Sequence, residues 1–312
     1  MEMSRVNSQP STRSNIRLGL KRLLSRRRLL FIGLVTPAFL LRIATAAYPI
    51  LQTVYLSFTN LNTLDNTNDF VGLENYLRIP SDFGVRGAFK FTIIFVVAST
   101  VLNLVVGLLI AMLLNASFSG KTFARTINLI PWAIPTIVAG YLFRWLLDDQ
   151  FGMIPHWVYA TTGNRIVPLI SPDGAQIAAI LVQVWKEAPF MAIIFLAGLQ
   201  GIPEELYDAA IVDGVNAWQR FWLITIPLVA PLAITLGSFR VVWSLANFDL
   251  IFGLTFGGPG VATSVLSLRV FQEGILYFKF GFASAISVIL LVLVGIVGLI
   301  ALRLARRYEV SY

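Results

Sequence analysis

The sequence contains no cysteine, a single histidine and few charged residues, and each shortage excludes a class of protein. Without cysteine, the 312-residue chain can form neither disulfides nor thiolate metal sites. The single histidine, His156, lies in a loop-like stretch and is expected to be structural rather than a metal ligand. Charged residues make up 13% of the chain and hydrophobic residues 57%, whereas soluble domains hold about 25% charged residues. A soluble fold of this size could not bury so much apolar surface, so lipid must cover part of it.

The excess of basic residues gives a formal charge of +8, but it does not indicate nucleic-acid binding. The basic residues gather at the ends of apolar runs rather than on a polar domain. The stretch 1–28 is polar and basic, which is typical of a topology anchor attracted to anionic lipid. No secretory cleavage signal is evident, because this stretch passes directly into apolar sequence that continues.

Six apolar runs are long enough to cross the membrane, since a helix needs roughly 20 residues for about 30 Å of hydrocarbon. Backbone groups in lipid must bond within their own segment, and the alternating pattern of barrel strands is absent. The sequence therefore predicts an all-α polytopic membrane protein with six transmembrane helices. The expected spans are 29–55, 88–114, 127–147, 176–199, 229–252 and 281–302.

Lysine and arginine in the loops predict which side of the membrane each loop occupies. Basic residues are frequent in the N-terminal stretch, after the second span and at the C-terminal end, whereas the opposite loops are mildly acidic. Both termini are therefore expected to be cytoplasmic. The predicted organisation is a cytoplasmic tail at 1–28, a six-span domain at 29–302 with a cytoplasmic loop at 201–228, and a cytoplasmic tail at 303–312.

The segment 201–227 is too polar to span the membrane and too regular for a slack loop. Pro203 suits a first helical turn, and two glutamates follow where the helix dipole favours acid. Gly214 stands where the end of a helix needs a left-handed residue. A second helical stretch at 217–226 is expected to stop at Pro227. The pair predicts a helix–turn–helix at the cytoplasmic membrane face.

Within this segment the sequence resembles the signature loop of binding-protein-dependent ABC importer permeases. That signature is usually written E-A-A-x3-G-x9-I-x-L-P, and the matching residues are Asp208-Ala209-Ala210, Gly214, Ile224 and Ile226-Pro227. Asp208 stands for the glutamate and Ile226 for the leucine. In that family this helical elbow docks in a cleft of an ATP-hydrolysing subunit. The resemblance implies that the ATPase-coupling residues are Glu205, Asp208, Ala209, Ala210, Asp213 and Gly214.

The residue types suit docking. Ala209 and Ala210 would let two backbones approach closely, Asp208 would offer a charge to a basic partner, and Gly214 would set the turn. The alternative interpretation is a merely amphipathic loop between spans.

The resemblance covers nearly the whole chain and indicates the sugar-uptake, maltose-type branch of the family, at the core of its larger permease subunit. It implies a type I ABC importer permease fold. The matching stretches are Tyr48-Pro49, Ser57-Phe58, Val71 to Tyr76, Pro131 to Pro135, Trp185, Pro189-Phe190, Leu199 to Pro203, Gly257 to Gly260, Thr263 and Ala283 to Ala285.

Charged groups inside a span cost roughly 2.5–3.5 kcal/mol each at the membrane centre, so they should face protein or water. Such groups are Arg42, Arg144, Lys186, Glu187 and Arg240. Lys186 and Glu187 are adjacent and expected to point in different directions, so each is free to meet Arg240, Asp249 or Arg144 from another helix. For Arg42 and Arg144, a helix-packing ion pair or snorkelling is an equally open interpretation.

The fifth run carries a polar stripe. Arg240, Ser244 and Asn247 recur at i, i+4 and i+7, which predicts one helix face, with Trp243 beside it. Polar groups beside an aromatic plane are what a sugar site uses, because hydroxyls need hydrogen bonds and the C–H face of the ring stacks. The alternative is that these side chains only join helices to one another.

The resemblance extends this site to neighbouring spans, at positions that match the substrate contacts of maltose-type permeases. The implied substrate-pathway residues are Trp132, Thr136, Lys186, Glu187, Phe190, Arg240, Trp243, Ser244 and Asn247. The charges at Lys186, Glu187 and Arg240 differ from the maltose permease. They leave the solute open and admit a more polar or charged sugar.

The resemblance implies one half of a heterodimeric import channel without catalytic activity of its own. The implied partners are a second permease subunit, two ATP-binding subunits that hold ATP and Mg, and an extracytoplasmic solute-binding protein that delivers the sugar. No cofactor is expected in this chain, and no nucleic acid among its partners. The implied location is the bacterial plasma membrane, with lipid around the spans.

Three other functions are alternatives to this one. A permease of the same family could carry a polyol or a glycerol-phosphate-type solute. An ion-coupled carrier would need no ATPase, but inverted repeats with broken helices are not visible and the elbow would be unexplained. A membrane-embedded enzyme lacks paired carboxylates, a metal cluster or a nucleophile–histidine arrangement. The stretch 119–122 mimics the end of a phosphate loop, but Asn115 stands where its leading glycine is required, so it predicts a turn.

Overall fold

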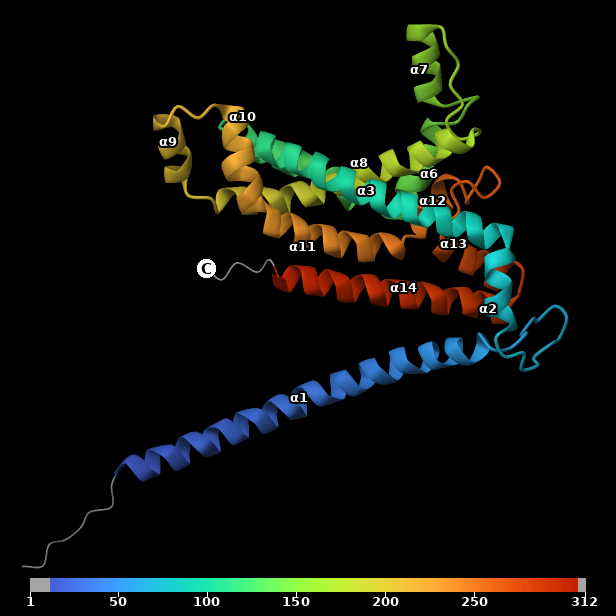
Figure 1. Ribbon diagram of the computed structural model, residues 1–312, viewed down its shortest axis with the longest axis horizontal. Helices are drawn as coiled ribbons and strands as arrows, with labels where there is room; N and C mark the ends of the chain where they lie inside the picture. Colours follow the sequence, from blue (N-terminus) through green and yellow to red (C-terminus); the bar gives the residue numbers. More distant parts are fainter. Residues whose placement is uncertain (1–11, 308–312) are drawn as a thin grey trace, which may run out of the picture. The chain divides into compact units, whose positions relative to one another are not determined.

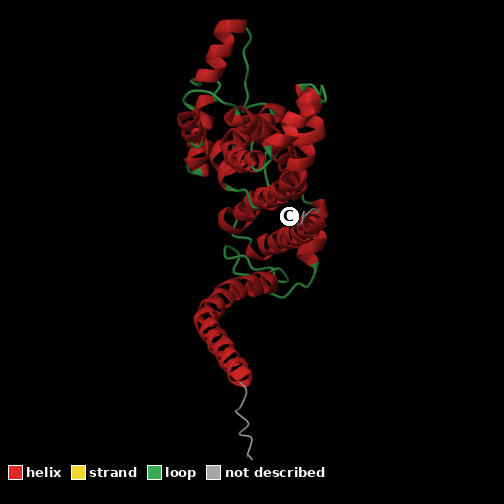
Figure 2. Cartoon of the chain, turned by 90° about the vertical axis from the view of Figure 1, so that its left-hand side faces the viewer, coloured by secondary structure: helices red, strands yellow, loops and turns green. Residues whose placement is uncertain are grey.

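The computed structural model describes residues 12–307, and the regular structure within them is helical (Figure 2). Two isolated backbone bridges, in a loop at residues 59–70, are the nearest approach to strand pairing in residues 12–307. The all-α prediction is confirmed. The chain divides into two compact units, Met1–Thr53 and Val54–Tyr312, which are described separately.

Helix α1 (Thr12–Leu56) accounts for the first unit and runs past its end. It begins at Thr12 rather than near residue 29, because leucine, lysine and arginine favour helix and extend it beyond the apolar run. Its apolar part, Leu29–Leu56, is long enough to cross a membrane. Residues 1–11 of the predicted N-terminal tail and residues 308–312 of the C-terminal tail lie outside the described residues.

The second unit opens with a loop and the short helices α2 (Glu74–Arg78) and η1 (Ile79–Ser81). Asn75 is buried and holds the loop: its Nδ2 donates to the carbonyls of Ser57 and Thr59 at 2.9 and 2.7 Å. The loop also pairs with the start of the last helix, because Gly281 N donates to the Leu61 carbonyl.

Four long helices form the bundle and lie alongside one another in Figure 1. They are α3 (Phe83–Asn115), α8 (Pro172–Gln200), α11 (Ile226–Leu245) and α14 (Phe280–Arg307). Side chains start two of them, since Asp82 accepts from Val85 N and Ser171 from Gly174 N. Gly107 lets α3 approach α8, because a Cβ there would lie 2.7 Å from the Cβ of Met191.

The third span is not one helix, so the prediction of an unbroken run at 127–147 is wrong. It consists of α4 (Lys121–Asn128), α5 (Ile130–Ala133) and α6 (Thr136–Leu146), with a bend of 90° between α5 and α6. Pro131 and Pro135 each lack the N–H that a continuous helix requires. A broken helix is thus present where the sequence showed none. Residues 12–307 contain five helices able to cross a membrane, or up to six if the bent pair is one span.

The fifth span also differs from its prediction at both ends. Helix α10 (Ala217–Arg220) continues through the π-helical turn η2 (Phe221–Thr225) into α11, and the three cross as one stretch, Ala217–Leu245. Pro227 does not stop the helix, because Ile226 N donates to the Phe221 carbonyl in the wider π turn and Pro227 falls at the start of α11. The chain then breaks before α12 (Asp249–Leu254), so the span ends at Leu245 rather than near residue 252.

The remaining elements sit at the two ends of the bundle. Helix α9 (Glu204–Val212) and α10 lie at one end, and α7 (Met153–Thr162), α12, α13 (Leu266–Phe271) and the π turn η3 (Gln272–Leu276) lie toward the other (Figure 1). Helix α12 packs on α6 by glycine contact, since a Cβ at Gly140 would lie 2.9 Å from the Leu250 carbonyl.

A charged group joins α13 to the start of α3. Arg269 pairs with Glu273 one turn further on, and its Nη2 lies 3.6 Å from Asp82 Oδ1. Burial raises the pKa of the Glu273 carboxyl, and the Arg269 charge opposes that shift. The cluster fixes the segment that returns the chain to α14.

Within residues 12–307 three apolar clusters form the core of the bundle, and the smallest of them consists of Val85, Ala88, Leu266, Phe282 and Ile286. The α12-side cluster consists of Phe91, Phe95, Leu147, Ala178, Ala179, Val182, Leu250, Ile251, Leu254, Val265 and Leu268. The elbow-side cluster consists of Ala111, Leu114, Met191, Ala192, Phe195, Leu196, Leu199, Val229 and Leu236. Helices α3 and α8 each contribute to the α12-side cluster and to the elbow-side cluster. Each of the two helices therefore has a stretch between these clusters that belongs to neither.

Candidate solute pathway and coupling elbow

Polar side chains of α3, α8 and α11 lie between the α12-side cluster and the elbow-side cluster. Gly107 packs on α8 at Met191, and a Cβ at Gly237 of α11 would lie 3.1 Å from Leu104 of α3, which sets the register of the three helices. We call this level the polar layer. Its buried members are Ser99, Thr100 and Asn103 on α3, Gln183, Lys186 and Glu187 on α8, and Arg240 and Ser244 on α11.

The charges of the polar layer pair with one another. Glu187 Oε1 lies 3.6 Å from Lys186 Nζ, and its Oε2 lies 3.6 Å from Arg240 Nη1. The prediction that Lys186 and Glu187 point apart is wrong, because long side chains from adjacent positions converge on one point. Of the three partners expected from other helices, Arg240 is the one that forms an ion pair with Glu187. Arg144 and Asp249 are exposed and take part in none of the ion pairs within residues 12–307.

Aromatic rings and amides adjoin these charges. The rings of Trp132 and Phe190 stack with their centroids 5.1 Å apart, and Lys186 Nζ donates to the Trp132 carbonyl at 3.2 Å. Asn247 Nδ2 donates to Gln183 Oε1 at 3.2 Å. The structure thus brings together residues predicted from the third, fourth and fifth spans.

The predicted stripe on the fifth span is only partly a helix face. Helix α11 ends at Leu245, so Asn247 lies beyond it and joins the polar layer through Gln183. Arg240 and Ser244 are each 2% exposed, whereas Trp243 is 60% exposed and packs beside Phe239. Thr136 is half-buried at the first position of α6. The charged residues therefore lie inside the subunit, Trp132 and Trp243 are exposed, and Phe190 is half-buried.

Sequence reasoning missed the polar residues of α3 and Gln183. Asn103 and Gln183 are fully buried, and Ser99 and Thr100 lie one turn or less from Asn103. The available signal was an amide in the middle of an apolar run, which is costly in lipid unless protein surrounds it.

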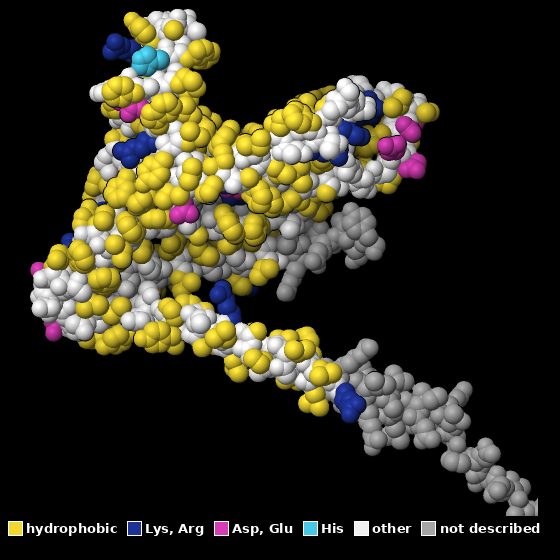
Figure 3. All heavy atoms as spheres, turned by 180° about the vertical axis from the view of Figure 1, so that it is seen from behind, with side chains coloured by type: hydrophobic (Ala, Val, Ile, Leu, Met, Phe, Trp, Pro, Cys, Tyr) yellow, Lys and Arg dark blue, Asp and Glu magenta, His cyan; other side chains and the backbone are white. Residues whose placement is uncertain are grey.

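The first helix of the elbow and the turn that follows it have the predicted form. Pro203 precedes α9, Gly214 follows it with φ of 76°, and Asn216 begins α10 through a capping box with Gln219. Glu205, Asp208, Ala209, Asp213 and Gly214 are exposed, and acidic side chains gather at this end of the molecule (Figure 3). Ala210 is 8% exposed and faces the interior of the chain, so the two alanines differ in their surroundings.

Tyr207 ties the elbow to the fifth span, a contact that the sequence did not indicate. Its hydroxyl lies 3.0 Å from Thr225 Oγ1 in η2. Beside it lies a cavity of about 250 Å³, bordered by Asn115, Tyr207 and Arg220. This hydrogen bond therefore links α9 to the span that carries Arg240.

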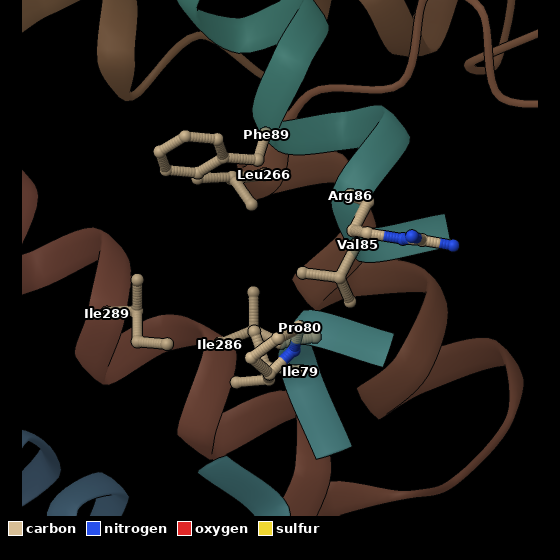
Figure 4. Close-up of a pocket in the computed structure, with 8 residues that line it drawn as sticks. All are labelled: Ile79, Pro80, Val85, Arg86, Phe89, Leu266, Ile286 and Ile289. Atoms are coloured by element: carbon tan, nitrogen blue, oxygen red, sulfur yellow. The ribbon is translucent and has the colours of Figure 1, made fainter. Parts of the chain in front are cut away.

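Of two other cavities, one is apolar and the other, beside α7, has polar side chains such as Asp149, Gln150 and Arg165 in its lining. One of about 220 Å³ lies between η1, α3 and α14 and is lined by aliphatic and aromatic groups, while the guanidinium of Arg86 points away from it (Figure 4). The other, of about 450 Å³, lies beside α7 and includes His156. His156 is in a helix rather than a loop, and its Nδ1 lies 3.0 Å from the Gly152 carbonyl. Residues 12–307 contain no cluster of histidine and acidic residues able to hold a metal ion.

Comparison with known proteins places these features in context. Residues 103–310 match the family described as binding-protein-dependent transport system inner membrane component. The chain is 36% identical, over 83% of its length and 87% of the relative, to the trehalose/maltose transport system permease protein MalF of Thermococcus litoralis. It is 34% identical, over 89% of its length and 91% of the relative, to the sulfoquinovosyl glycerol transport system permease protein SmoG of Agrobacterium fabrum. A chain of a bacterial ABC transporter that imports the acidic polysaccharide alginate has the same fold, with a TM-score of 0.80 at 22% identity, covering 93% of this chain and 99% of that one.

Proposed function

The chain belongs to the family of binding-protein-dependent transport system inner membrane components, and from this premise we propose that it forms half of the translocation pathway of an ABC importer for a sugar. It is a multi-pass membrane protein of a family of transport subunits. The observation that carries the proposal is the elbow, a short helix with an exposed acidic and alanine face, joined through Tyr207 to the span that contributes Arg240. An isolated interspan loop would not require that linkage.

The proposed transporter contains other subunits besides this chain. A second permease subunit completes the pathway, an extracytoplasmic solute-binding protein delivers the solute, and two ATP-binding subunits hold ATP and Mg. The elbow docks on one of these ATP-binding subunits, and the chain itself is not an enzyme. Both termini lie in the cytoplasm, on the side of the elbow, as the basic residues near the ends of the chain favour.

The solute passes beside the aromatic side chains at the edge of the polar layer. Trp132 and Trp243 are exposed, and flat rings of this kind stack on the C–H face of a sugar. Relatives named for trehalose/maltose and for sulfoquinovosyl glycerol support a sugar or glycoside. The experiment is uptake of a panel of labelled sugars into vesicles that hold the reconstituted complex and ATP. Accumulation that needs both ATP and the binding protein is the expected result, and accumulation driven by an ion gradient alone would contradict it.

A second solute class is favoured by one observation. Arg240 is almost fully buried, and its Nε and Nη2 have no hydrogen-bond partner within residues 12–307. Lys186 and Arg240 both pair with the single carboxylate of Glu187, so the three side chains together carry an excess of positive charge. A glycerol-phosphate-type solute or another anionic derivative would balance it, and the same uptake panel distinguishes anionic from neutral solutes.

Replacing Trp243 with Ala is expected to raise the KM for uptake about tenfold, because one stacking surface for the sugar is lost. Folding of the subunit should be unchanged, since Trp243 is 60% exposed. Trp145→Ala is the matched control, because Trp145 is 61% exposed but lies away from the polar layer, near the end of α6. Equal uptake kinetics in the two variants would remove Trp243 from the pathway.

A further inference from the structure

We infer that Lys186 is a positioning residue that fastens the break in the third span to α8 and thereby orients Trp132, rather than a group that contacts the solute. This role rests on the proposed function, because it reassigns one residue of the proposed pathway. The observations that carry it are the geometry of the break, the two contacts of the Lys186 ammonium and the stack of Trp132 on Phe190.

The break leaves backbone carbonyl groups at the end of α5 without the partners that a continuous helix would give them. Ile134 and Pro135 are extended, with ψ values of 132° and 135°, and Pro135 has no N–H to donate. In an unbroken helix the Trp132 carbonyl would accept from the N–H of Thr136, four residues further on. Water is scarce inside a bilayer, so a donor from another element is needed.

The ammonium of Lys186 supplies this donor. Its Nζ lies 3.2 Å from the Trp132 carbonyl oxygen and 3.6 Å from Glu187 Oε1. The side chain is 5% exposed. An ammonium has three donors and two protein groups lie beside this one, but only 5% of the side chain is exposed, so a solute has little access to it. Lys186 is therefore poorly placed to bind a solute and well placed to hold the break.

Two further contacts join the same stretch to α8. Asn128 Nδ2 donates to the Pro189 carbonyl at 3.1 Å, and the rings of Trp132 and Phe190 stack at an interplanar angle of 12°. Trp132 remains 43% exposed, so part of its surface is free while its carbonyl is fixed. Extended residues between two helices are where hinge motions occur. Loss of the Lys186 bond would allow the break to pivot and would misplace the Trp132 ring.

The absence of cysteine helps to measure this role, because two introduced thiols can be spin-labelled without any other substitution in this chain. Phe123→Cys and Trp145→Cys place the labels at exposed positions on α4 and α6, on either side of the break. The distance between the labels is measured by electron paramagnetic resonance on the assembled transporter in nanodiscs. Two variants are compared, Lys186→Met, which removes the donor, and Lys186→Gln, which keeps an N–H donor and removes the charge.

Lys186→Met is expected to widen the distance distribution about twofold and to raise the KM for uptake about tenfold, as for the loss of one buried hydrogen bond. Lys186→Gln is expected to keep a distribution close to the parent's width. A parent-like distribution in Lys186→Met would overturn the role, whatever happens to transport. If both variants also lose uptake equally, Lys186 contacts the solute.

If Lys186→Met does not assemble, Lys186→Leu, which also lacks a donor, is measured in its place. A broad distribution in Lys186→Leu beside a parent-like one in Lys186→Gln then supports the role, and parent-like distributions in both contradict it. The distance measurement does not depend on uptake, so absence of ATP-dependent uptake in the parent would count against the proposed function and leave the positioning result intact.

Discussion

Replacing Ala209 with Glu is expected to abolish co-purification of the ATP-binding subunit while the chain still inserts into the membrane. Ala209 is exposed on α9, beside the exposed carboxylate of Asp208. A larger, charged side chain there would hold the elbow away from the floor of a docking cleft and would bury an unpaired charge in the interface. The measurement is the amount of ATP-binding subunit recovered with the tagged permease from detergent extracts.

The matched control is Ala116→Glu, the same exchange at an exposed position in the turn that follows α3. This variant should keep the ATP-binding subunit. Ala210 is a poor choice for the experiment, because it is buried against its own chain and a glutamate there would disturb the elbow itself. Full recovery of the partner with Ala209→Glu would show that α9 is not the docking surface.

Replacing Glu187 with Gln is expected to destabilise the subunit by about 3–5 kcal/mol, which is typical when one member of a buried ion pair is removed. Glu187 is the carboxylate between Lys186 and Arg240, and both cations would then face each other without compensation. Burial makes this repulsion strong, since water can screen little of it. The measurement is the midpoint of thermal unfolding of the detergent-solubilised complex.

The double variant Glu187→Gln/Arg240→Met should recover much of this loss, because it returns the local charge to its original value. Glu204→Gln serves as the surface control, since Glu204 is exposed at the start of α9 and a change there should leave the midpoint nearly unchanged. If the double variant is less stable than Glu187→Gln alone, the charges of the polar layer do not act as one group.

The Glu187 and Lys186 variants examine different properties of neighbouring residues. Glu187 stabilises the polar layer by balancing two cations, whereas Lys186 holds the Trp132 carbonyl at the break. A loss of stability without widening of the break is expected for Glu187→Gln. The reverse, a widening of the break without a comparable loss of stability, is expected for Lys186→Met when it is compared with Lys186→Gln.

The sequence by itself determined the class of fold and the elbow. Long apolar runs can only be helices in lipid, so the presence of apolar helices was predictable without knowledge of their neighbours. The start of α9 after Pro203 and its end at Gly214 follow from local backbone chemistry, and both are present in the structure.

Only the tertiary structure decided how the helices break and which side chains meet. Hydropathy sums over a window, so it detected neither the 90° bend between α5 and α6 nor the end of α11 at Leu245. Glu187 pairs with Lys186 and Arg240, and Ala210 is buried beside an exposed Ala209, because packing against neighbouring helices determines which side of each helix is buried. Burial and pairing of this kind depend on contacts between residues far apart in the chain, and a local sequence pattern does not contain that information.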